Sequence, residues 1–375
     1  MPIHNSARPV AVCLLILVAA AALLATGQAG AARRLGTPHV ANRFTSRAFA
    51  SAATLSHPTA SGHEALAKPD DITSLGGDIY VGFQNGVGPQ GEPSATGNRD
   101  STIVEFNRGG HRVAQWDVVG KCDGLTGDPA LHAVIATVNE DAHSSLYLIA
   151  PGHRAIHMRY SRPLPSRGGS DAISIDRGTI LISASAPGTT GAQAPRAAYP
   201  AVYRATLHLA ARVVTLRPLF SDEAMAKSGS GRVRLALTDP DSSEIVPAWA
   251  QRFAGDFMLT SQGDEQQIFR NARGRLSVLK LSASVDDTAW PSAAGGTLYA
   301  TNTGAGTIDR ITGPFRRGSV LVAATPCDES NAPSTCPAPG FPANYLGVLD
   351  PRSGMISRAA VGGAPLAPQG LLFMP

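Results

Sequence analysis

Short apolar runs recur in groups of four along the sequence from Pro69 onward. The first group comprises residues 71–73, 78–83, 102–106 and 112–118. The groups begin at Asp71, Asp123, Asp171, Asp241 and Asp287. Runs this short, separated by segments rich in Gly, Pro, Ser and Asn, are typical of β-strands. The pattern therefore predicts strands arranged in sets of four, with starts roughly 50 residues apart.

This period predicts an all-β chain folded as a single β-propeller over residues 69–375. Its length fits about six four-stranded blades, with seven as the alternative. A pair of β-sandwiches or a β-helix would also contain many strands, but neither repeats them in fours. The fifth unit is expected to hold residues 297–301 and 307–311 after Asp287, and residues 369–373 are expected to form an innermost strand that closes the ring.

A propeller brings the starts of its innermost strands and the ends of its second strands to one face of the ring, around the mouth of the central channel. The innermost strands start at Asp70-Asp71, Asp123, Asp171, Asp241 and Asp286-Asp287, and the second strands end at residues such as Gln84-Asn85, Asn139-Glu140, Gln262 and Asn302. We therefore expect a ligand site at the mouth formed by Asp71, Gln84, Asn85, Asp123, Asn139, Glu140, Asp171, Asp287 and Asn302. A purely structural role is the alternative, because Asp often accepts backbone N–H groups in turns.

Two segments resemble a known group of propellers. The sequences GGDIYVGFQN (76–85) and GGTLYATNTGAGTIDRI (295–311) are similar to blades of the NHL, SMP-30/gluconolactonase-like and YVTN group. The resemblance implies metal ligands of the Glu, Asn and Asp type at the channel mouth. By position, Asn139, Asp287 and Asn302 would hold Ca²⁺ or another divalent metal. The early Glu ligand of the lactonases has no counterpart here, because Gln84 or Asp71 occupies its neighbourhood.

The first 68 residues have a different character. Residues 10–25 form an unbroken apolar run, shorter than the ~20 residues of a membrane-spanning helix. It is followed by Ala29-Gly30-Ala31, a cleavage pattern of small residues. We interpret residues 1–31 as a secretory signal peptide cut after Ala31, which predicts a secreted or extracytoplasmic protein, with an uncleaved anchor as the alternative. Residues 32–68 are expected to be a flexible tether.

Composition and charge narrow the classes of partner. The chain is 43% hydrophobic and 16% charged, which excludes a largely disordered protein. Its net charge of +4 comes mainly from arginines scattered singly or in pairs. A nucleic-acid-binding protein usually concentrates basic residues on one face, so we expect no nucleic-acid partner. We expect a monomer, with a cell-envelope polymer as a further candidate partner.

Export affects the cysteines. In an oxidising compartment Cys327 and Cys336, which lie in a Pro- and Ser-rich stretch, are expected to form a disulfide. Cys122 would then be a free and buried thiol.

No recognisable catalytic set accompanies these features, since nucleophile-elbow, P-loop and zincin motifs are absent from the sequence. The sequence favours a secreted propeller that binds a small molecule, glycan or peptide at its mouth. One alternative is a metal-assisted hydrolase of the lactonase kind, or a lyase. A second is a cell-envelope scaffold. Whether the protein is an enzyme stays open.

Overall fold

The computed structural model describes residues 43–59, 62–164, 169–186, 199–327 and 343–375. All of them belong to the second of two compact units, residues 41–375. The predicted signal peptide and cleavage site lie outside the described residues. Within these ranges the only helices are the short 3₁₀ turns Ala52–Thr54 and Leu209–Ala211. None of the described helices is long and apolar enough to cross a bilayer.

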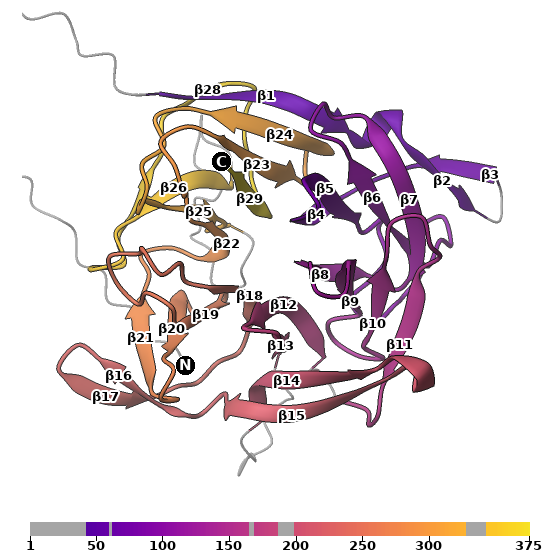
Figure 1. Cartoon of the computed structure of the whole chain (residues 1–375). Coiled ribbons are helices and arrows are strands. Elements are labelled where there is room, and N and C mark those ends of the chain that lie inside the picture. The colour runs from indigo at the N-terminus through magenta and orange to yellow at the C-terminus, as the bar shows by residue number, and fades with distance from the viewer. Residues whose placement is uncertain (1–42, 60–61, 165–168, 187–198, 328–342) are drawn as a thin grey trace, which may run out of the picture. The chain divides into compact units, whose positions relative to one another are not determined.

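The strands form a β-propeller, so the predicted fold class is confirmed (Figure 1). Each four-stranded set is called a blade and is listed from the channel outwards. Blade 1 contains β4 (Pro69–Leu75), β5 (Asp78–Phe83), β6 (Asp100–Phe106) and β7 (Arg112–Val119). Blade 2 contains β8 (Cys122–Asp128), β9 (Ala133–Val138), β10 (Ser145–Ile149) and β11 (Ile156–Tyr160). Blade 3 contains β12 (Ser170–Asp176), β13 (Thr179–Ala184), β14 (Pro200–His208) and β15 (Val213–Ser221). Blade 4 contains β18 (Pro240–Ile245), β19 (Phe257–Ser261), β20 (Gln266–Arg270) and β21 (Leu276–Lys280).

The predicted fifth unit is wrong, because the strands expected to follow Asp287 within it, β23 (Thr297–Asn302) and β24 (Thr307–Thr312), belong to the next blade. Blade 5 contains β22 (Val285–Ala289), β25 (Val320–Ala324), β26 (Tyr345–Leu349) and β27 (Ile356–Arg358). Blade 6 contains β29 (Leu371–Met374), β23 (Thr297–Asn302), β24 (Thr307–Thr312) and β1 (Phe44–Ser51). The chain therefore leaves blade 5 after β22, builds the middle of blade 6, and returns. As predicted, residues near 369–373 form an innermost strand, and it pairs with β23.

The folded part begins before Pro69, so the tether predicted for residues 32–68 is wrong over most of its described length. Strand β1 pairs antiparallel with β24, and β28 (Val361–Gly363) pairs with its other edge. The Phe49 ring packs edge-on against Tyr299, with 4.9 Å between centroids. Strands β2 (Ser56–Thr59) and β3 (Gly62–Ala65) follow as a hairpin. Blade 6 thus combines an N-terminal outermost strand with a C-terminal innermost strand, which closes the ring.

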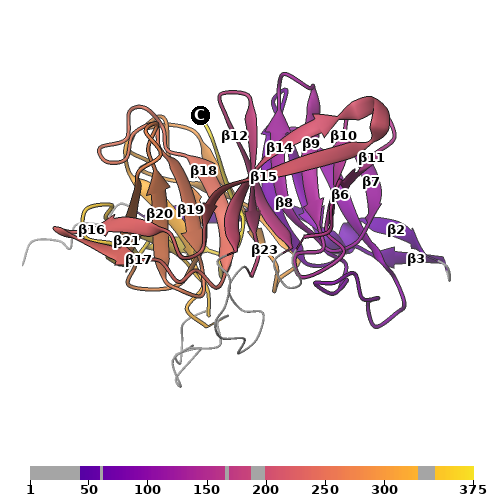
Figure 2. The same ribbon diagram turned by 90° about the horizontal axis from the view of Figure 1, so that it is seen from below.

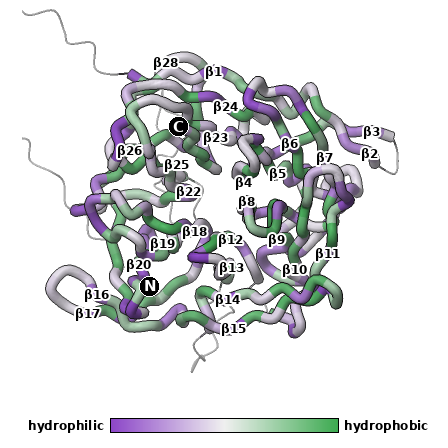
Figure 3. Tube along the Cα trace, in the orientation of Figure 1, coloured by the Kyte–Doolittle hydropathy of each residue, from purple (hydrophilic) through white to green (hydrophobic). Residues whose placement is uncertain are grey.

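Hydrophobic residues along the strands form the core, which lies between neighbouring blades (Figure 3). Tyr80 and Ile103 of blade 1, for example, cluster with Leu125 and Val134 of blade 2. Two hairpins project from the sides of the ring, β2–β3 and the pair β16 (Met225–Ser228) and β17 (Gly231–Arg234) (Figure 2). The blades are therefore held together by apolar packing between sheets and not by sheet hydrogen bonds alone.

A β-bulge interrupts five innermost strands near their starts. The register shifts at residues 70–71, 123–124, 171–172, 241 and 286–287. A bulge inserts an unpaired residue and bends the strand, so it redirects side chains at that point. Each of these bulges begins with an aspartate. In blade 6, Gln369 takes the place of the aspartate, and Gly370, directly before β29, corresponds to Gly124.

Backbone and side-chain hydrogen bonds at the bulge level join neighbouring blades. Thr137 accepts a hydrogen bond from Gly124 N (2.9 Å) in blade 2 and donates one to the Asp171 carbonyl of blade 3. Thr301 makes the same pair of contacts with Gly370 N (2.8 Å) and the Asp70 carbonyl, joining blades 6 and 1.

Carboxylates make the corresponding contact at two other boundaries. Asp71 accepts from Leu125 N, joining blades 1 and 2, and Asp287 accepts from Leu371 N at 2.6 Å, joining blades 5 and 6. The bulge level therefore ties four of the blade boundaries together.

Replacing Gly124 with Ala should destabilise the ring at the boundary between blades 2 and 3. A Cβ atom there would lie 2.4 Å from the Asp171 carbonyl oxygen and 2.7 Å from Thr137 Oγ1. We expect Gly124→Ala to lower the free energy of unfolding by ~1–3 kcal/mol, measured by urea denaturation. The matched control is Gly304→Ala, because a Cβ at Gly304 meets no atom within 4 Å. Equal stability of the two variants would contradict the proposed tie.

Candidate functional site

The central channel contains a cavity of about 600 Å³ with an acidic lining. Its lining includes eight carboxyl side chains, those of Asp70, Asp71, Asp123, Asp171, Asp241, Glu244, Asp286 and Asp287. No Lys, Arg or His is among the described residues that line it. The bulges explain this concentration, because each brings an aspartate to the same level of the ring.

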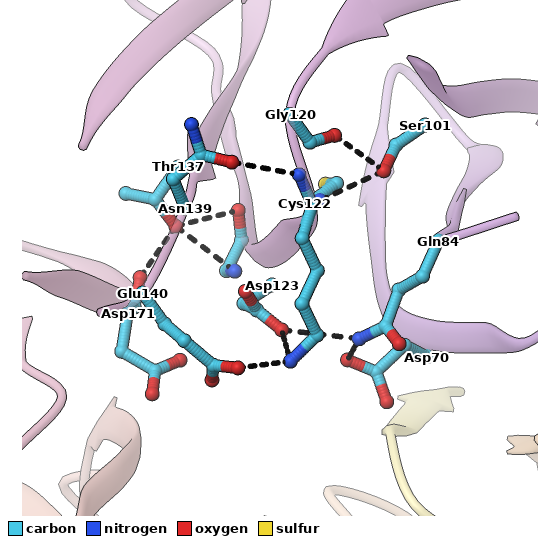
Figure 4. Close-up of polar contacts among 12 residues, drawn as sticks. Asp70, Gln84, Ser101, Gly120, Cys122, Asp123, Thr137, Asn139, Glu140 and Asp171 are labelled. Atoms are coloured by element: carbon cyan, nitrogen blue, oxygen red, sulfur yellow. Dashed lines mark hydrogen bonds and ion pairs between the residues drawn. The ribbon is translucent and has the colours of Figure 1, made fainter. Parts of the chain in front are cut away.

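Lys121 reaches this lining from outside the cavity and is the centre of a polar network. Its Nζ lies 2.9 Å from Asp123 Oδ1 and also contacts Glu140 Oε1. Gln84 Nε2 donates to Asp70 Oδ2 at 2.8 Å and to Asp123 Oδ1 at 3.0 Å. Figure 4 shows Gln84 between Asp70 and Asp123, with Glu140 on the other side of Asp123. Blades 1 and 2 thus share one ion-paired cluster at the mouth.

Burial sets the protonation of this cluster. It raises the pKa of Asp70 and of Asp123 to about 6, although Lys121 acts in the opposite direction. Burial and the nearby Asp123 raise the pKa of Glu140 to about 7. Burial disfavours the charged form of Lys121, but Asp123, Glu140 and Asp70 outweigh it and raise the lysine pKa. Lys121 therefore stays an ammonium at neutral pH, while its carboxyl partners titrate near neutrality.

The carboxyls of Asp171 and Asp241, in blades 3 and 4, form no ion pair with a described residue. Burial, reinforced by Asp123 and Glu140, raises the pKa of Asp171 well above its ordinary value. Burial, reinforced by Asp286 and Asp171, does the same for Asp241. Two carboxylate oxygens in the lining, Asp123 Oδ2 and Asp241 Oδ2, are buried without a hydrogen-bond partner among the described residues. Unpaired buried acceptors cost free energy, so they call for an external donor.

The predicted site residues fall into three groups. Gln84, Asp123 and Glu140 are brought together in the Lys121 network. Asp71, Asp171 and Asp287 line the cavity, and Asp71 and Asp287 also form the ties between blades. The remaining three, Asn85, Asn139 and Asn302, hold backbone: Asn85 accepts from Ala67 N, Asn139 from Lys121 N and Asn302 from Ala305 N. Their role is therefore to position the mouth.

The three predicted metal ligands do not fit a shared ion. The amide oxygens of Asn139 and Asn302 accept backbone N–H groups, and both carboxylate oxygens of Asp287 do the same, from Thr288 and Leu371. No hydrogen bond among the described residues joins any two of the three. In the described parts of the chain, no group of three or more His, Cys, Asp or Glu is arranged to hold a metal ion. The oxygens that a metal would need are already used.

Sequence reasoning left out several members of the site. Asp70, Asp241 and Asp286 were recognised at strand starts but not placed among the binding residues. Lys121 was missed altogether. The available signal was position: Lys121 is one of four lysines in the chain, and it stands two residues before the first bulge residue of blade 2.

The cysteine predictions have separate outcomes. Cys122 is a free and buried thiol, as predicted, and burial raises its pKa well above the ordinary value. A thiol held protonated in this way is a poor nucleophile. Cys336 lies outside the described residues, so its pairing with Cys327 stays a prediction.

Comparison with known proteins finds only distant structural likenesses. Neither a protein-family model nor a curated protein matches the sequence. Similar solved structures include a Bacteroides caccae protein of unknown function, at 10% identity and a TM-score of 0.46, covering 82% of this chain and 88% of that one. A streptogramin B lyase is 12% identical with a TM-score of 0.43, and the match covers 87% of this chain and 90% of that one. A candidate gluconolactonase is 12% identical with a TM-score of 0.42, and the match covers 87% of this chain and 84% of that one. At these values the likeness is one of fold and carries no inference about activity.

The pH dependence of stability should reveal the crowded carboxyls. A carboxyl whose pKa is raised in the folded state holds its proton where the unfolded chain has lost it, so stability falls as pH rises through that interval. The interval runs from the ordinary value of 3.8 to about 6 for Asp70 and Asp123 and to about 7 for Asp287. We expect the Tm to be higher at about pH 5 than at about pH 7.5.

The Asp171→Asn variant tests the cause. It removes one crowded carboxyl, so the Tm at about pH 7.5 should rise by ~2–4 °C and the pH slope should flatten. Asp176→Asn, at the other end of β12, is the matched control and should keep the wild-type slope. Thermal unfolding followed by circular dichroism gives both values. A lower Tm for Asp171→Asn at about pH 7.5 would overturn the explanation.

Proposed function

We propose that this protein is a ligand-binding β-propeller that takes a small molecule at the acidic mouth of its channel. The observation that carries the proposal is that two residues of the cavity lining, Asp123 and Asp241, each have a buried carboxylate oxygen (Oδ2) without a hydrogen-bond partner among the described residues. A volume of about 600 Å³ lies within the range typical of small-molecule sites and is small for a folded partner.

Stability alone does not account for these aspartates. Asp71 and Asp287 have a structural role, because their carboxylates accept backbone N–H groups of the next blade. Asp171 and Asp241 lie at the same level and are strongly desolvated, and neighbouring carboxylates raise the pKa of each. Groups retained at such a cost are typical of binding and catalytic sites.

A thermal-shift panel of neutral sugars, carboxylates and amines tests this function. At ~100 times its dissociation constant, a ligand stabilises the folded chain by ~2.7 kcal/mol. We expect a saturable shift with at least one class, abolished by Asp241→Asn and retained in the control Asp176→Asn. A panel without any saturable shift, or a shift insensitive to Asp241→Asn, would reject the proposal.

Acid–base catalysis, as in a hydrolase or lyase, is the second candidate, and the Lys121 network favours it. Asp123 and Glu140 flank one ammonium and have pKa values of about 6 and about 7, which suit proton transfer at neutral pH. A bound molecule would then be chemically changed. Mass spectrometry of the bound compound after incubation decides between the two functions, and Glu140→Gln should abolish turnover while leaving binding in place. The predicted export would place either activity outside the cytoplasm.

A further inference from the structure

The charge balance of the cavity restricts what can bind there. Eight carboxyl groups line it, and the described lining contains no basic residue. An anionic ligand would add to this repulsion, and a neutral one would leave it unrelieved. A cationic ligand would relieve it and would also supply donors to the unpartnered Asp123 Oδ2 and Asp241 Oδ2.

The chain itself shows which kind of cation suits this ring. The Lys121 ammonium occupies the arc at blade 2, in contact with Asp123 and Glu140. The bulges define the equivalent position in each blade, two residues before the first bulge residue. That position holds Lys68 in blade 1, Gly169 in blade 3, Asp239 in blade 4, Ser284 in blade 5 and Ala367 in blade 6, where Gly370 corresponds to Gly124.

The equivalents of Lys121 leave the arc at blades 3 and 4 without an internal ammonium. Lys68 is exposed, and Gly169 has no side chain. In blade 4 the lysine is replaced by an acid, Asp239, whose carboxylate accepts from Gly263 N at 3.1 Å. Asp171 and Asp241 therefore face the cavity near the Asp239 carboxylate, which raises the pKa of both. Lys121 lowers the pKa of Asp171, but burial and the nearby Asp123 and Glu140 outweigh it.

Part of the cavity lining is apolar. Beyond the aspartates the cavity is lined by half-buried Ile175, Ile245, Leu372 and Phe373. Trp290 also lines it; this side chain is 8% exposed, and its Nε1 donor has no partner among the described residues. Apolar lining of this kind binds the hydrocarbon part of a ligand.

We infer that the ligand is an organic cation, with a primary ammonium bound between Asp171 and Asp241 and an apolar body extending along the channel. This inference rests on the proposed function of the channel as a small-molecule site, and it deepens that proposal by naming the ligand class. An ammonium has three donors and no acceptor, which suits two neighbouring carboxylates of which one, Asp241, has an oxygen without a donor among the described residues. Ca²⁺ would need six to eight oxygen ligands, and no described group of acidic residues is arranged to supply them.

Isothermal titration calorimetry with phenethylamine and its neutral analogue 2-phenylethanol tests the ammonium. The two probes share the aromatic body and differ in the charged head. A charge-assisted hydrogen bond contributes about 1.5–3 kcal/mol, so we expect the dissociation constant of phenethylamine to be at least about tenfold lower at neutral pH and low salt. Asp241→Asn should remove most of that difference, and the matched control Asp176→Asn should keep it.

The outcomes separate the two claims. If 2-phenylethanol binds as tightly as phenethylamine, or if Ca²⁺ gives the binding heat and the amine gives none, the ammonium inference is wrong while a small-molecule site survives. If no probe of the broader panel binds, the proposed function fails as well.

Lys121→Met provides an independent gain-of-binding test. The variant vacates the internal ammonium position between Asp123 and Glu140, so methylammonium should bind at least about tenfold more tightly than to the wild type. Absence of that gain in a variant with a wild-type circular dichroism spectrum would overturn the use of Lys121 as a guide to the ligand. If the variant does not fold without added amine and folds with it, the expected outcome is met.

Discussion

The β-bulge at the start of five innermost strands is the feature on which both the ring and its site depend. At this level Thr137, Thr301, Asp71 and Asp287 reach the backbone of the next blade and tie four boundaries together. The same bulges bring an aspartate to the channel in five blades. Structure and candidate chemistry are therefore built from neighbouring residues of one short motif, and a change in the bulge affects both.

The aspartates differ in how their charge is compensated. Backbone donors satisfy Asp71 and Asp287, and Lys121 with Gln84 compensates Asp123. Asp171 and Asp241 are held close to other acids in a desolvated ring, which raises the pKa of both. Such an arrangement weakens the folded state at neutral pH, because buried like charges repel one another and lose their hydration. Other interactions in the fold must offset this cost. The blade-to-blade apolar packing supplies that stability here.

The sequence made the strand quartets and the aspartates at their starts predictable, because both are local patterns. The pairing of β22 with β25 was not predictable, because β23 and β24, which lie between them in the sequence, belong to blade 6. Strand partners far apart in sequence leave no local pattern. Strand β1 was missed because FTSRAFAS is rich in Ala and Ser, and its pairing with β24 forms only in the closed ring. Asn139 and Asn302 looked like metal ligands by position, but Asn139 accepts from Lys121 N directly before β8, and Asn302 accepts from Ala305 N in the turn after β23. The role of Lys121 was not predictable from the sequence, because only the fold places it between Asp123 and Glu140.

The central claim is that a ring of buried aspartates titrates near neutrality and receives a cation. The most direct measurement is a carbon-13 NMR pH titration of aspartate carboxyls, with and without phenethylamine. We expect a subset of aspartates to titrate with midpoints at about 6 to about 7, as for Asp123 and Asp287, in every folded sample. These midpoints should move to lower pH when the amine is added. Aspartates that all titrate near the ordinary value of 3.8, or midpoints unaffected by saturating amine, would contradict it.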